Sequence, residues 1–444
     1  MKTRDVVIEL LSQLGSSREA REYLRKFSSR NSAQFAVIKV GGEILQNDLE
    51  QLASSLGFLH HVGLFPIVLH GAGTQLNQAL QEAGIDTHKI EGVRVTTPEV
   101  MSVIRPVMYR LNHNLIEALE SLGIRSRSLQ HGVFECDYEN EDQFGLVGKV
   151  KRVHMEGIMS SIESGALPIV TCLGETSGGQ VMNINADVAA AQLVLAIQPQ
   201  KIIFISPTGG LLNNNDHIIS AINLETDYDR LLAADWVHSG MRLKLIQIHE
   251  LLQQLPSSSS VSITSAGNLT RELFTHRGAG TLIRRGEGFC IENEIGDSRR
   301  DELKSLIEVC FQRGLDNRYF DSLNVNALIW ASSGRAAGVI DQGCNDICYM
   351  DKFVVTPSAQ GEGVGNALWQ QIRQRFPQLY WRSREDNPVN SWYNRNSDFC
   401  IRNGRWQVFG YGINDMSLVA NLVADAAGRG EFWIDSTLEE ESLA

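Results

Sequence analysis

The chain has 444 residues, of which 43% are hydrophobic and 21% are charged. These proportions are typical of a folded globular protein with two or three domains, and they exclude a disordered or fibrous chain. The 52 acidic residues exceed the 40 basic ones, and the formal net charge of -12 argues against nucleic acid and anionic membrane surfaces as partners.

The cysteines and the amino-terminal segment indicate the cellular compartment. Seven cysteines are too few and too scattered for a disulfide framework. Cys344 and Cys348 form the only close pair, with no second pair at zinc spacing. No stretch reaches the roughly 18 uncharged apolar residues of a membrane span, and Asp5 and Glu9 interrupt the segment where a secretory signal would be apolar. We expect a cytoplasmic protein with reduced thiols and no metal site.

Residues 1–30 are predicted to form a helical arm. Apolar residues from Ala20 to Phe27 recur at helical spacing, and Ser16 with Glu19 makes a capping box before them. The arm either folds back on its own domain or packs against the same arm of another subunit. Periodicity does not distinguish these alternatives.

Residues 31–285 alternate between strands and helices. The first two strands, 35–40 and 65–70, each end in a glycine turn. Further strands are predicted at 168–171, 201–206 and 261–265, with helices between them, including 186–197 and 241–255. This pattern predicts an α/β domain with a mostly parallel sheet sandwiched by helices. In such sheets ligands bind at the carboxyl ends of the strands, where the glycine turns lie.

The alternation stops near residue 285. Residues 286–297 carry three glycines and several acidic residues without clear periodicity, and we interpret them as a linker. Residues 298–444 show a helix, strands with Trp and Tyr, a glycine turn and a further amphipathic helix. We predict a second, α+β domain here, long enough for a core of its own.

Charged residues beside the glycine turns suggest phosphate chemistry. Lys39 stands two residues before Gly41, which Gly42 follows, and an ammonium ion near backbone N–H donors suits the oxygens of a phosphoryl group, although a lysine at a strand end is often simply solvated. Asp187 lies near the start of a helix, where a carboxylate also serves as a cap. Lys244 lies near the start of another helix, the end that a cation avoids on electrostatic grounds, which favours a ligand there.

Five motifs follow in order between residues 35 and 285: IKVGGE, LHGAGTQ, GVRVTTPEV, MNINADVAA and GMRLK. This set resembles the amino acid kinase family, specifically acetylglutamate kinases. The resemblance implies transfer of a phosphoryl group from ATP, with Mg²⁺, to N-acetylglutamate. It implies that Lys39 and Lys244 flank the transferred group and that Asp187 holds both lysines. It also implies four glycines that bind phosphate through their backbone N–H groups (Gly41, Gly42, Gly71 and Gly73). Two further residues, Arg94 and Asn183, are implied to bind N-acetylglutamate.

The carboxyl-terminal domain contains a glycine turn of its own. A strand at 349–356 runs into glycines and a helix at 366–375, an arrangement that suits a pyrophosphate but also occurs in plain tight turns. The stretches DKFVV, AQGEGVGNALW and SREDNPVNSWY resemble the GNAT acetyltransferases, and residues 298–412 resemble the synthase domain of vertebrate-type N-acetylglutamate synthases. The resemblance implies residues that bind the pyrophosphate of acetyl-CoA (Gln360, Gly361, Gly363 and Gly365) and glutamate (Lys352, Arg384 and Asn387).

Tyr393 is the candidate acid for the acetyl transfer. The reaction needs a deprotonated amine, a polarised thioester carbonyl and a proton donor for the leaving thiolate. Tyr393 is surrounded in the sequence by other aromatic residues, so packing is its competing role. The family likeness favours catalysis.

The two resemblances together imply a bifunctional enzyme of arginine biosynthesis that makes N-acetylglutamate and then phosphorylates it. Two alternatives remain open: a kinase with a regulatory second domain, and a synthase whose first domain is an arginine sensor or oligomerisation scaffold. In arginine-sensitive relatives an amino-terminal helix and a segment matching residues 274–283 shape the effector site. We therefore expect inhibition by L-arginine and a homotetramer.

Overall fold

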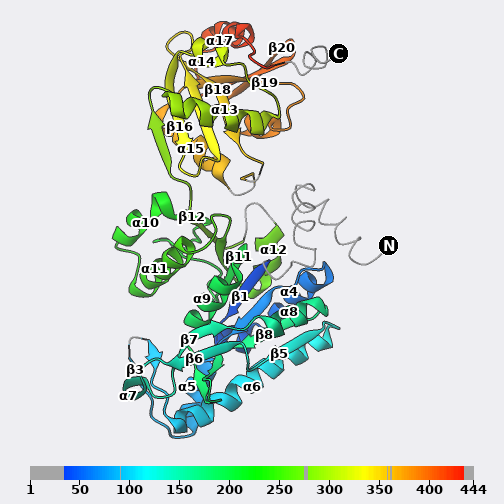
Figure 1. Ribbon diagram of the computed structural model, residues 1–444, viewed down its shortest axis with the longest axis vertical. Coiled ribbons are helices and arrows are strands. Elements are labelled where there is room, and N and C mark those ends of the chain that lie inside the picture. The colour runs from blue at the N-terminus through cyan, green and yellow to red at the C-terminus, as the bar shows by residue number, and fades with distance from the viewer. Residues whose placement is uncertain (1–34, 91, 275–278, 358, 361–362, 435–444) are drawn as a thin grey trace. The chain divides into compact units, whose positions relative to one another are not determined.

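The computed structural model describes residues 35–90, 92–274, 279–357, 359–360 and 363–434. The chain divides into two compact units after Arg285, each with its own sheet and core (Figure 1). The arm predicted at residues 1–30 lies outside the described residues. None of the helices in the described ranges is long and apolar enough to cross a membrane.

An eight-stranded sheet forms the centre of the first unit, in the order β12-β14-β13-β11-β1-β2-β8-β5. Every neighbouring pair is parallel except β13 with β14, which confirms the predicted mostly parallel sheet. Strands β2 and β8 are buried along their whole length, as expected where helices cover a parallel sheet. The strands are β1 (Ala36–Val40), β2 (Ile67–His70), β5 (Ser126–Leu129), β8 (Leu167–Thr171), β11 (Lys201–Ile205), β12 (Ala221–Asn223), β13 (Ser260–Thr264) and β14 (Thr281–Arg284).

Helices pack on this sheet and contribute apolar side chains to the same hydrophobic core. The longest, α6, begins where the Thr97 side chain accepts a hydrogen bond from the Val100 N–H and Pro98 occupies the first turn. Helices α6, α8 and α9 contact the strands directly. The helices are α3 (Gly42–Asn47), α4 (Leu49–His61), α5 (Gly73–Glu82), α6 (Pro98–Ser121), α7 (Glu141–Phe144), α8 (Glu156–Glu163), α9 (Ala186–Ile197), α10 (Leu224–Ala233), α11 (Ser239–Gln253), α12 (Leu269–Phe274) and the 3-10 turn η2 (Ala266–Asn268).

Two smaller sheets complete the first unit. A four-stranded sheet has the order β10-β9-β6-β7, and a short hairpin pairs β3 with β4. These sheets carry two predicted substrate-binding residues, Asn183 at the end of β10 and Arg94 at the end of β4. The strands are β3 (Lys89–Ile90), β4 (Val93–Arg94), β6 (Phe134–Tyr138), β7 (Gly148–Val153), β9 (Leu173–Glu175) and β10 (Val181–Asn183).

The second unit is built on a seven-stranded sheet in the order β15-β16-β17-β18-β19-β21-β20. Its strands are antiparallel except β18 and β19, so the unit is the α+β domain that the sequence predicts. The elements are β15 (Phe289–Glu292), β16 (Val325–Ala331), β17 (Ala336–Asp341), β18 (Cys348–Val355), β19 (Leu379–Arg384), β20 (Phe399–Asn403), β21 (Trp406–Tyr411), α13 (Asp297–Phe311), α14 (Arg318–Ser322), α15 (Val364–Arg375), α16 (Asn390–Arg395) and α17 (Met416–Gly428).

Both faces of the second sheet are covered, because alternate residues of a strand point to opposite faces. On β16, Ile329 joins a cluster with residues of α15, whereas Leu328 and Trp330 join a cluster with residues of α13 and α14. A third cluster packs α17 against β19 and β21. The second unit therefore has a core of its own.

The structure corrects the prediction that residues 286–297 are a linker. Residues 286–297 contain strand β15, in which Phe289 pairs with Ala331 and Glu292 with Leu328 of β16. Residues 289–292, in the middle of this stretch, thus belong to the second sheet as its edge strand. Partial exposure at an edge explains why the hydrophobic pattern is weak there.

Candidate active sites

Lys39 and Asp187 form an ion pair at the carboxyl end of β1. The Lys39 Nζ lies 2.8 Å from Asp187 Oδ1, and the Lys39 side chain is largely buried whereas Asp187 is half exposed. Asp187 stands in the first turn of α9, where the Asn185 side chain accepts a hydrogen bond of 2.9 Å from the Asp187 N–H. The helix end therefore fixes the carboxylate that holds Lys39.

Lys244 on α11 joins this pair electrostatically. Burial is the main cause that lowers the pKa of Lys244; the Lys39 ammonium lowers it further, and the Asp187 carboxylate raises it. These effects require both charges to be near Lys244. The three residues predicted to act on the phosphoryl group are thus brought together, although they are separated by up to 205 positions in the sequence.

Both glycine turns lie beside this cluster and touch each other. The Gly71 N–H donates a hydrogen bond of 2.9 Å to the Val40 carbonyl, and a Cβ at Gly42 would lie 3.0 Å from the Ala72 backbone. A Cβ at Gly41 or Gly73, in contrast, would meet no atom within 4 Å. Protein packing therefore does not explain glycine at these two positions, and the backbone there is open to a ligand.

A buried histidine, His70, immediately precedes the second glycine turn. His70 is fully buried at the end of β2, and its ring nitrogen Nε2 lies 3.1 Å from the amide nitrogen of Asn112 on α6. Asn112 also donates a hydrogen bond to the Ile169 carbonyl and accepts one from Ser128. Burial lowers the pKa of His70 to about 4, so the ring is neutral at neutral pH. The sequence analysis missed this contact because 42 residues separate its partners.

The neutral His70 predicts a loss of stability in mild acid. The pKa of His70 falls from 6.5 to about 4 on folding, so the unfolded chain binds a proton between these pH values and the folded chain does not. This difference should remove about 3 kcal/mol of stability between pH 6.5 and pH 4. Amide hydrogen exchange of β1 and β2 across this range measures it. The pH slope should be shallower in the His70→Gln variant, and an equal slope in both proteins would contradict the prediction.

The two residues predicted to bind N-acetylglutamate are linked through Thr96. The Asn183 amide donates a hydrogen bond of 3.1 Å to the Thr96 hydroxyl, which donates one of 2.9 Å to the Arg94 carbonyl. The Arg94 guanidinium donates to Asn77 on α5, and burial lowers the pKa of Arg94. An arginine held in a partly buried place suits a carboxylate ligand. Thr96 and Asn77 carry no sequence signal that we recognised.

The second unit has a gap between β18 and β19. The two strands are paired only at Cys348 with Leu379 and at Tyr349 with Tyr380. Beyond these positions, the edge of β18 that faces β19 has no strand partner among the described residues. A chain with amide and carbonyl groups, such as the pantetheine arm of a coenzyme A, would satisfy these backbone groups.

The glycine turn lies between β18 and α15 in the chain. Gly363 precedes the first turn of α15 with a φ of 88°, a conformation that favours glycine, and a Cβ at Gly365 would lie at an ordinary contact distance of 3.5 Å from the Val355 side chain. The Gln360 side chain contacts the Val355 carbonyl at 3.5 Å. The predicted Gly361 lies outside the described residues. The arrangement places N–H groups at the start of a twelve-residue helix, which favours an anion.

Tyr393 on α16 lies in an aromatic cluster. Its ring centroid is 5.5 Å from that of Trp381, 5.4 Å from Phe409 and 5.6 Å from Trp392. Burial raises the pKa of the Tyr393 hydroxyl above its usual value, so the group keeps its proton at neutral pH. Only 7% of the residue is exposed. The geometry therefore fits a proton donor and also fits the packing role that the sequence left open.

The residues predicted to hold glutamate all have carboxylate or backbone partners. Lys352 Nζ lies 2.6 Å from Asp351, and Arg384 lies 2.8 Å from Glu431. The Asn387 N–H donates to the Arg384 carbonyl, so these two share one turn after β19. Lys352 also lies 5.9 Å from the ring centroid of Trp433. Residues 430–433 thus contact both cations, a feature absent from our sequence analysis.

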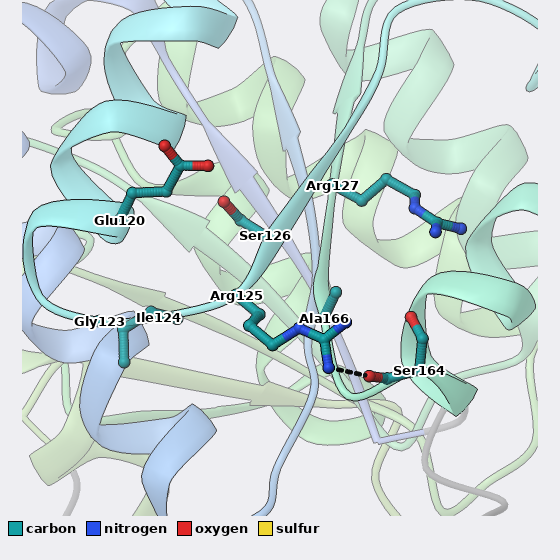
Figure 2. A pocket seen from close by; sticks show the side chains of 8 residues that line it. All are labelled: Glu120, Gly123, Ile124, Arg125, Ser126, Arg127, Ser164 and Ala166. Carbon is teal, nitrogen blue, oxygen red and sulfur yellow. Dashed lines mark hydrogen bonds between the residues drawn. The ribbon is translucent and has the colours of Figure 1, made fainter.

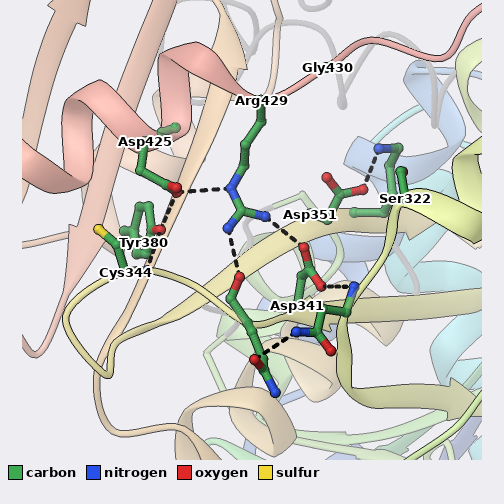
Figure 3. A network of polar contacts seen from close by, with 12 residues as sticks. Ser322, Asp341, Cys344, Asp351, Tyr380, Asp425, Arg429 and Gly430 are labelled. Atoms are coloured by element: carbon green, nitrogen blue, oxygen red, sulfur yellow. Dashed lines mark hydrogen bonds and ion pairs between the residues drawn. The ribbon is translucent and has the colours of Figure 1, made fainter.

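A polar network surrounds the end of α17, which precedes that segment. The Arg429 guanidinium binds Asp341 at 2.7 Å and Asp425 at 2.9 Å, and Tyr380 donates to Asp425 (Figure 3). Arg382 binds the last carbonyl groups of α17 and the Gly430 carbonyl. These contacts satisfy the free end of the helix and explain its position.

Other features of the described residues lie apart from these sites. A surface pocket beside the edge strand β5 is lined by Arg125, Arg127 and Ser164, among others, and by none of the predicted site residues (Figure 2). Within the described ranges, no group of three or more His, Cys, Asp or Glu side chains has a geometry that could hold a metal ion.

Comparisons with known protein families define the class of each unit. Residues 34–273 match the model of the amino acid kinase family, and residues 291–429 match the model of the N-acetyltransferase domain of N-acetylglutamate synthase. The chain therefore joins a kinase domain to an acetyltransferase domain.

Relatives of similar length identify the family. The acetylglutamate kinase of Xanthomonas campestris is 45% identical over 420 residues, which cover 94% of this chain and 99% of that protein. The mitochondrial N-acetylglutamate synthase of Homo sapiens is 31% identical, with 94% of this chain and 77% of that protein covered. The chain belongs to the acetylglutamate kinase group of the amino acid kinase family that carries an N-acetylglutamate synthase-type acetyltransferase domain.

Solved structures agree on the fold. The N-acetylglutamate synthase of Neisseria gonorrhoeae, complexed with coenzyme A and N-acetylglutamate, has a TM-score of 0.67 at 18% identity, covering 89% of this chain and 98% of that one. The same protein complexed with coenzyme A and L-arginine has a TM-score of 0.56 at 16% identity, covering 90% and 98%.

Proposed function

We propose that this chain catalyses two consecutive steps of arginine biosynthesis. The second unit transfers an acetyl group from acetyl-CoA to L-glutamate, and the first unit phosphorylates the resulting N-acetyl-L-glutamate with ATP to N-acetylglutamyl 5-phosphate. The observation that carries the proposal is the cluster of Lys39, Asp187 and Lys244 beside two open glycine turns. A purely regulatory first unit would need neither the two cations nor the open turns.

In the kinase site the carboxylate of N-acetylglutamate attacks the γ-phosphorus of ATP, and the bond to the ADP oxygen breaks. The nucleophile is already ionised at neutral pH, so no general base is needed, and positioning with charge neutralisation carries the rate. Lys39 and Lys244 neutralise the charge on the oxygens of the transferred group. The Asp187 carboxylate attracts both ammonium ions and so holds them in place. Arg94 and Asn183 hold the acceptor, and the N–H groups of the two turns bind the phosphates.

The residues of this site also fit Mg²⁺ bound with ATP. Mg²⁺ commonly keeps several waters and takes most of its other ligands from substrate phosphates. When bound, it would supply neutralisation of the β- and γ-phosphate charge. Asp187, the carboxylate of the cluster, is paired with Lys39, so ATP rather than a protein carboxylate would bring the ion into the site.

In the acetyltransferase site the amine of glutamate, after losing a proton, attacks the thioester carbonyl, and the bond to sulfur breaks. The leaving thiolate takes a proton from the Tyr393 hydroxyl, which burial keeps protonated, and the attacking nitrogen gives up its second proton as the amide forms, which restores the Tyr393 hydroxyl. The N–H groups near Gly363 and Gly365 bind the pyrophosphate of acetyl-CoA, and we assign Gln360 and Gly361 to the same role. Lys352, Arg384 and Asn387 hold the glutamate carboxylates.

Two initial-rate assays on one purified preparation test this proposal. The first measures ADP release with N-acetylglutamate and ATP, and the second measures CoA release with glutamate and acetyl-CoA. We expect both products, each dependent on its own acceptor. If ADP release shows no dependence on N-acetylglutamate, the first unit is a sensor or scaffold; if CoA release shows none on glutamate, the second unit is a regulator.

We also propose L-arginine as an effector and a homotetramer as the assembled form. Lys201 is partly buried near Glu272 and Arg284, and desolvation together with the Arg284 charge lowers the pKa of Lys201 to about 8 although Glu272 raises it. These charges adjoin the segment 274–283, of which residues 275–278 lie outside the described ranges. Opposite charges in one partly buried place suit an amino-acid ligand. The arginine bound to the Neisseria protein supports the choice of ligand.

A thermal-shift measurement tests the effector. A ligand at about 100 times its Kd adds roughly 2.7 kcal/mol to the stability of the state that binds it. Millimolar L-arginine should therefore raise the melting temperature, whereas D-arginine, the control, should not. An equal shift with both enantiomers, or none with either, would contradict the proposal.

A further inference from the structure

Strand β18 carries an irregularity at Asp351. On the neighbouring β17, Val339 pairs with Lys352 and the next residue, Ile340, pairs with Met350, so Asp351 has no partner in the register. Neighbouring side chains of a regular strand point to opposite faces. A bulge changes this direction locally, and here it places the Lys352 Nζ 2.6 Å from Asp351 Oδ2.

The Asp351 carboxylate has a second donor. Tyr319 on α14 is buried, and its hydroxyl donates a hydrogen bond of 2.8 Å to the same oxygen, Oδ2. Burial alone would raise the pKa of Asp351, but the Lys352 ammonium and the Tyr319 hydroxyl together lower it below its usual value. Asp351 is therefore ionised at neutral pH, and its charge is compensated by these two groups.

Lys352 is held from two sides. Besides its contact with Asp351, its ammonium nitrogen lies 4.6 Å from the centroid of the Tyr319 ring, within the range of a cation–π interaction. Tyr319 thus acts twice, through its ring on Lys352 and through its hydroxyl on Asp351. An ammonium ion has three donors, and one contact with Asp351 leaves the others for a ligand.

We propose that Asp351 is a positioning residue of the acetyltransferase site, which together with Tyr319 holds the Lys352 ammonium ion in one orientation for a carboxylate of the amino-acid substrate. This inference rests on the proposed role of Lys352 in binding glutamate. Asp351 does not touch the substrate. It acts by limiting the rotamers of a long, flexible side chain, so that less conformational entropy is lost when glutamate binds.

A competing account is that Asp351 only stabilises the core of the second unit. The chain offers a matched control in Asp341, which also lies on this sheet, is buried, and binds an arginine, Arg429, at 2.7 Å (Figure 3). Among the described residues, no hydrogen bond or ion pair joins Asp341 to Lys352. Loss of either carboxylate removes one ion pair from the same unit, but only the loss of Asp351 frees Lys352.

Steady-state kinetics of acetyl transfer on the full-length protein separate these accounts. We measure kcat and the KM values of glutamate and acetyl-CoA for wild type and the variants Asp351→Asn, Tyr319→Phe, Asp341→Asn and Lys352→Met. The KM of glutamate should rise about 10-fold or more in Asp351→Asn and Lys352→Met. Tyr319→Phe keeps the ring and should raise it about 3-fold. The KM of acetyl-CoA should stay unchanged in all four, as should that of glutamate in Asp341→Asn.

Two results would overturn the inference in different ways. If Lys352→Met raises the KM of glutamate but Asp351→Asn and Tyr319→Phe do not, Lys352 binds glutamate without help and Asp351 is structural. If Lys352→Met itself leaves the KM of glutamate unchanged, the proposed role of Lys352 fails, and the inference fails with it. If the Asp351→Asn protein no longer saturates with acetyl-CoA, its second unit is damaged as a whole. The KM of glutamate in the milder Tyr319→Phe variant then decides between the two accounts.

Discussion

Replacing Lys39 by alanine should lower the rate of ADP formation by about 10³-fold and leave acetyl transfer unchanged. The Lys39 ammonium lies at the carboxyl end of β1, beside both glycine turns, where charge develops on the transferred phosphoryl group. Its removal also leaves Asp187 without its ion-pair partner, so that a carboxylate would repel the phosphates. The measurement is the initial rate of ADP release at saturating N-acetylglutamate.

Lys149→Ala is the matched control for this experiment. Lys149 is an exposed lysine on β7 with no part in the proposed site, so its loss should leave ADP formation within twofold of wild type. Acetyl transfer by the same Lys39→Ala preparation reports whether the rest of the chain is intact. A Lys39→Ala protein that keeps more than about a tenth of the wild-type rate would show that phosphoryl transfer does not depend on this cluster.

Replacing Tyr393 by phenylalanine should lower acetyl transfer by about 10²-fold while ADP formation stays unchanged. Phenylalanine keeps the ring that packs against Trp381 and Phe409 and removes only the hydroxyl. If Tyr393 donates the proton to the leaving thiolate, kcat falls and the KM of acetyl-CoA does not change. If Tyr393 only packs, neither changes. The substitution therefore separates the two roles that sequence and structure both allow.

Tyr411→Phe is the corresponding control. The Tyr411 hydroxyl, on β21 of the same unit, accepts a hydrogen bond of 2.7 Å from Arg373 and lies at an exposed position. Its removal should leave acetyl transfer within twofold of wild type. Equal losses in Tyr393→Phe and Tyr411→Phe would point to a general loss of stability in the second unit and would remove the case for Tyr393 as the acid.

The sequence predicted those parts of the fold that depend on local signals. Strand β11 was expected at 201–206 and spans Lys201–Ile205, and α9 was expected at 186–197 and occupies those residues. In both, hydrophobic pattern, glycine and capping residues act within a few positions of one another. The same holds for the glycine turns, whose sequence is short and contiguous. The chemical roles of the residues there stay predictions.

Contacts between distant segments were beyond the sequence analysis. Strand β15 was interpreted as a linker because only its pairing with β16, about 40 residues away, defines it as a strand. The bulge at Asp351 depends on the register with β17, and Tyr319, its partner, comes from α14. Glu431 reaches Arg384 across 47 positions. None of these contacts leaves a periodic trace in the chain, because the partners meet only after the sheet has formed.

The most direct test of the central claim follows one acetyl group through both reactions. Wild-type protein receives isotopically labelled acetyl-CoA, glutamate and ATP, with hydroxylamine present to trap the acyl phosphate, and mass spectrometry identifies the labelled products. We predict labelled N-acetylglutamyl hydroxamate from wild type, labelled N-acetylglutamate alone from Lys39→Ala, and neither from a variant that lacks acetyl transfer. Wild-type protein that yields labelled N-acetylglutamate without the hydroxamate, or no labelled product, would contradict the claim that one chain carries both activities.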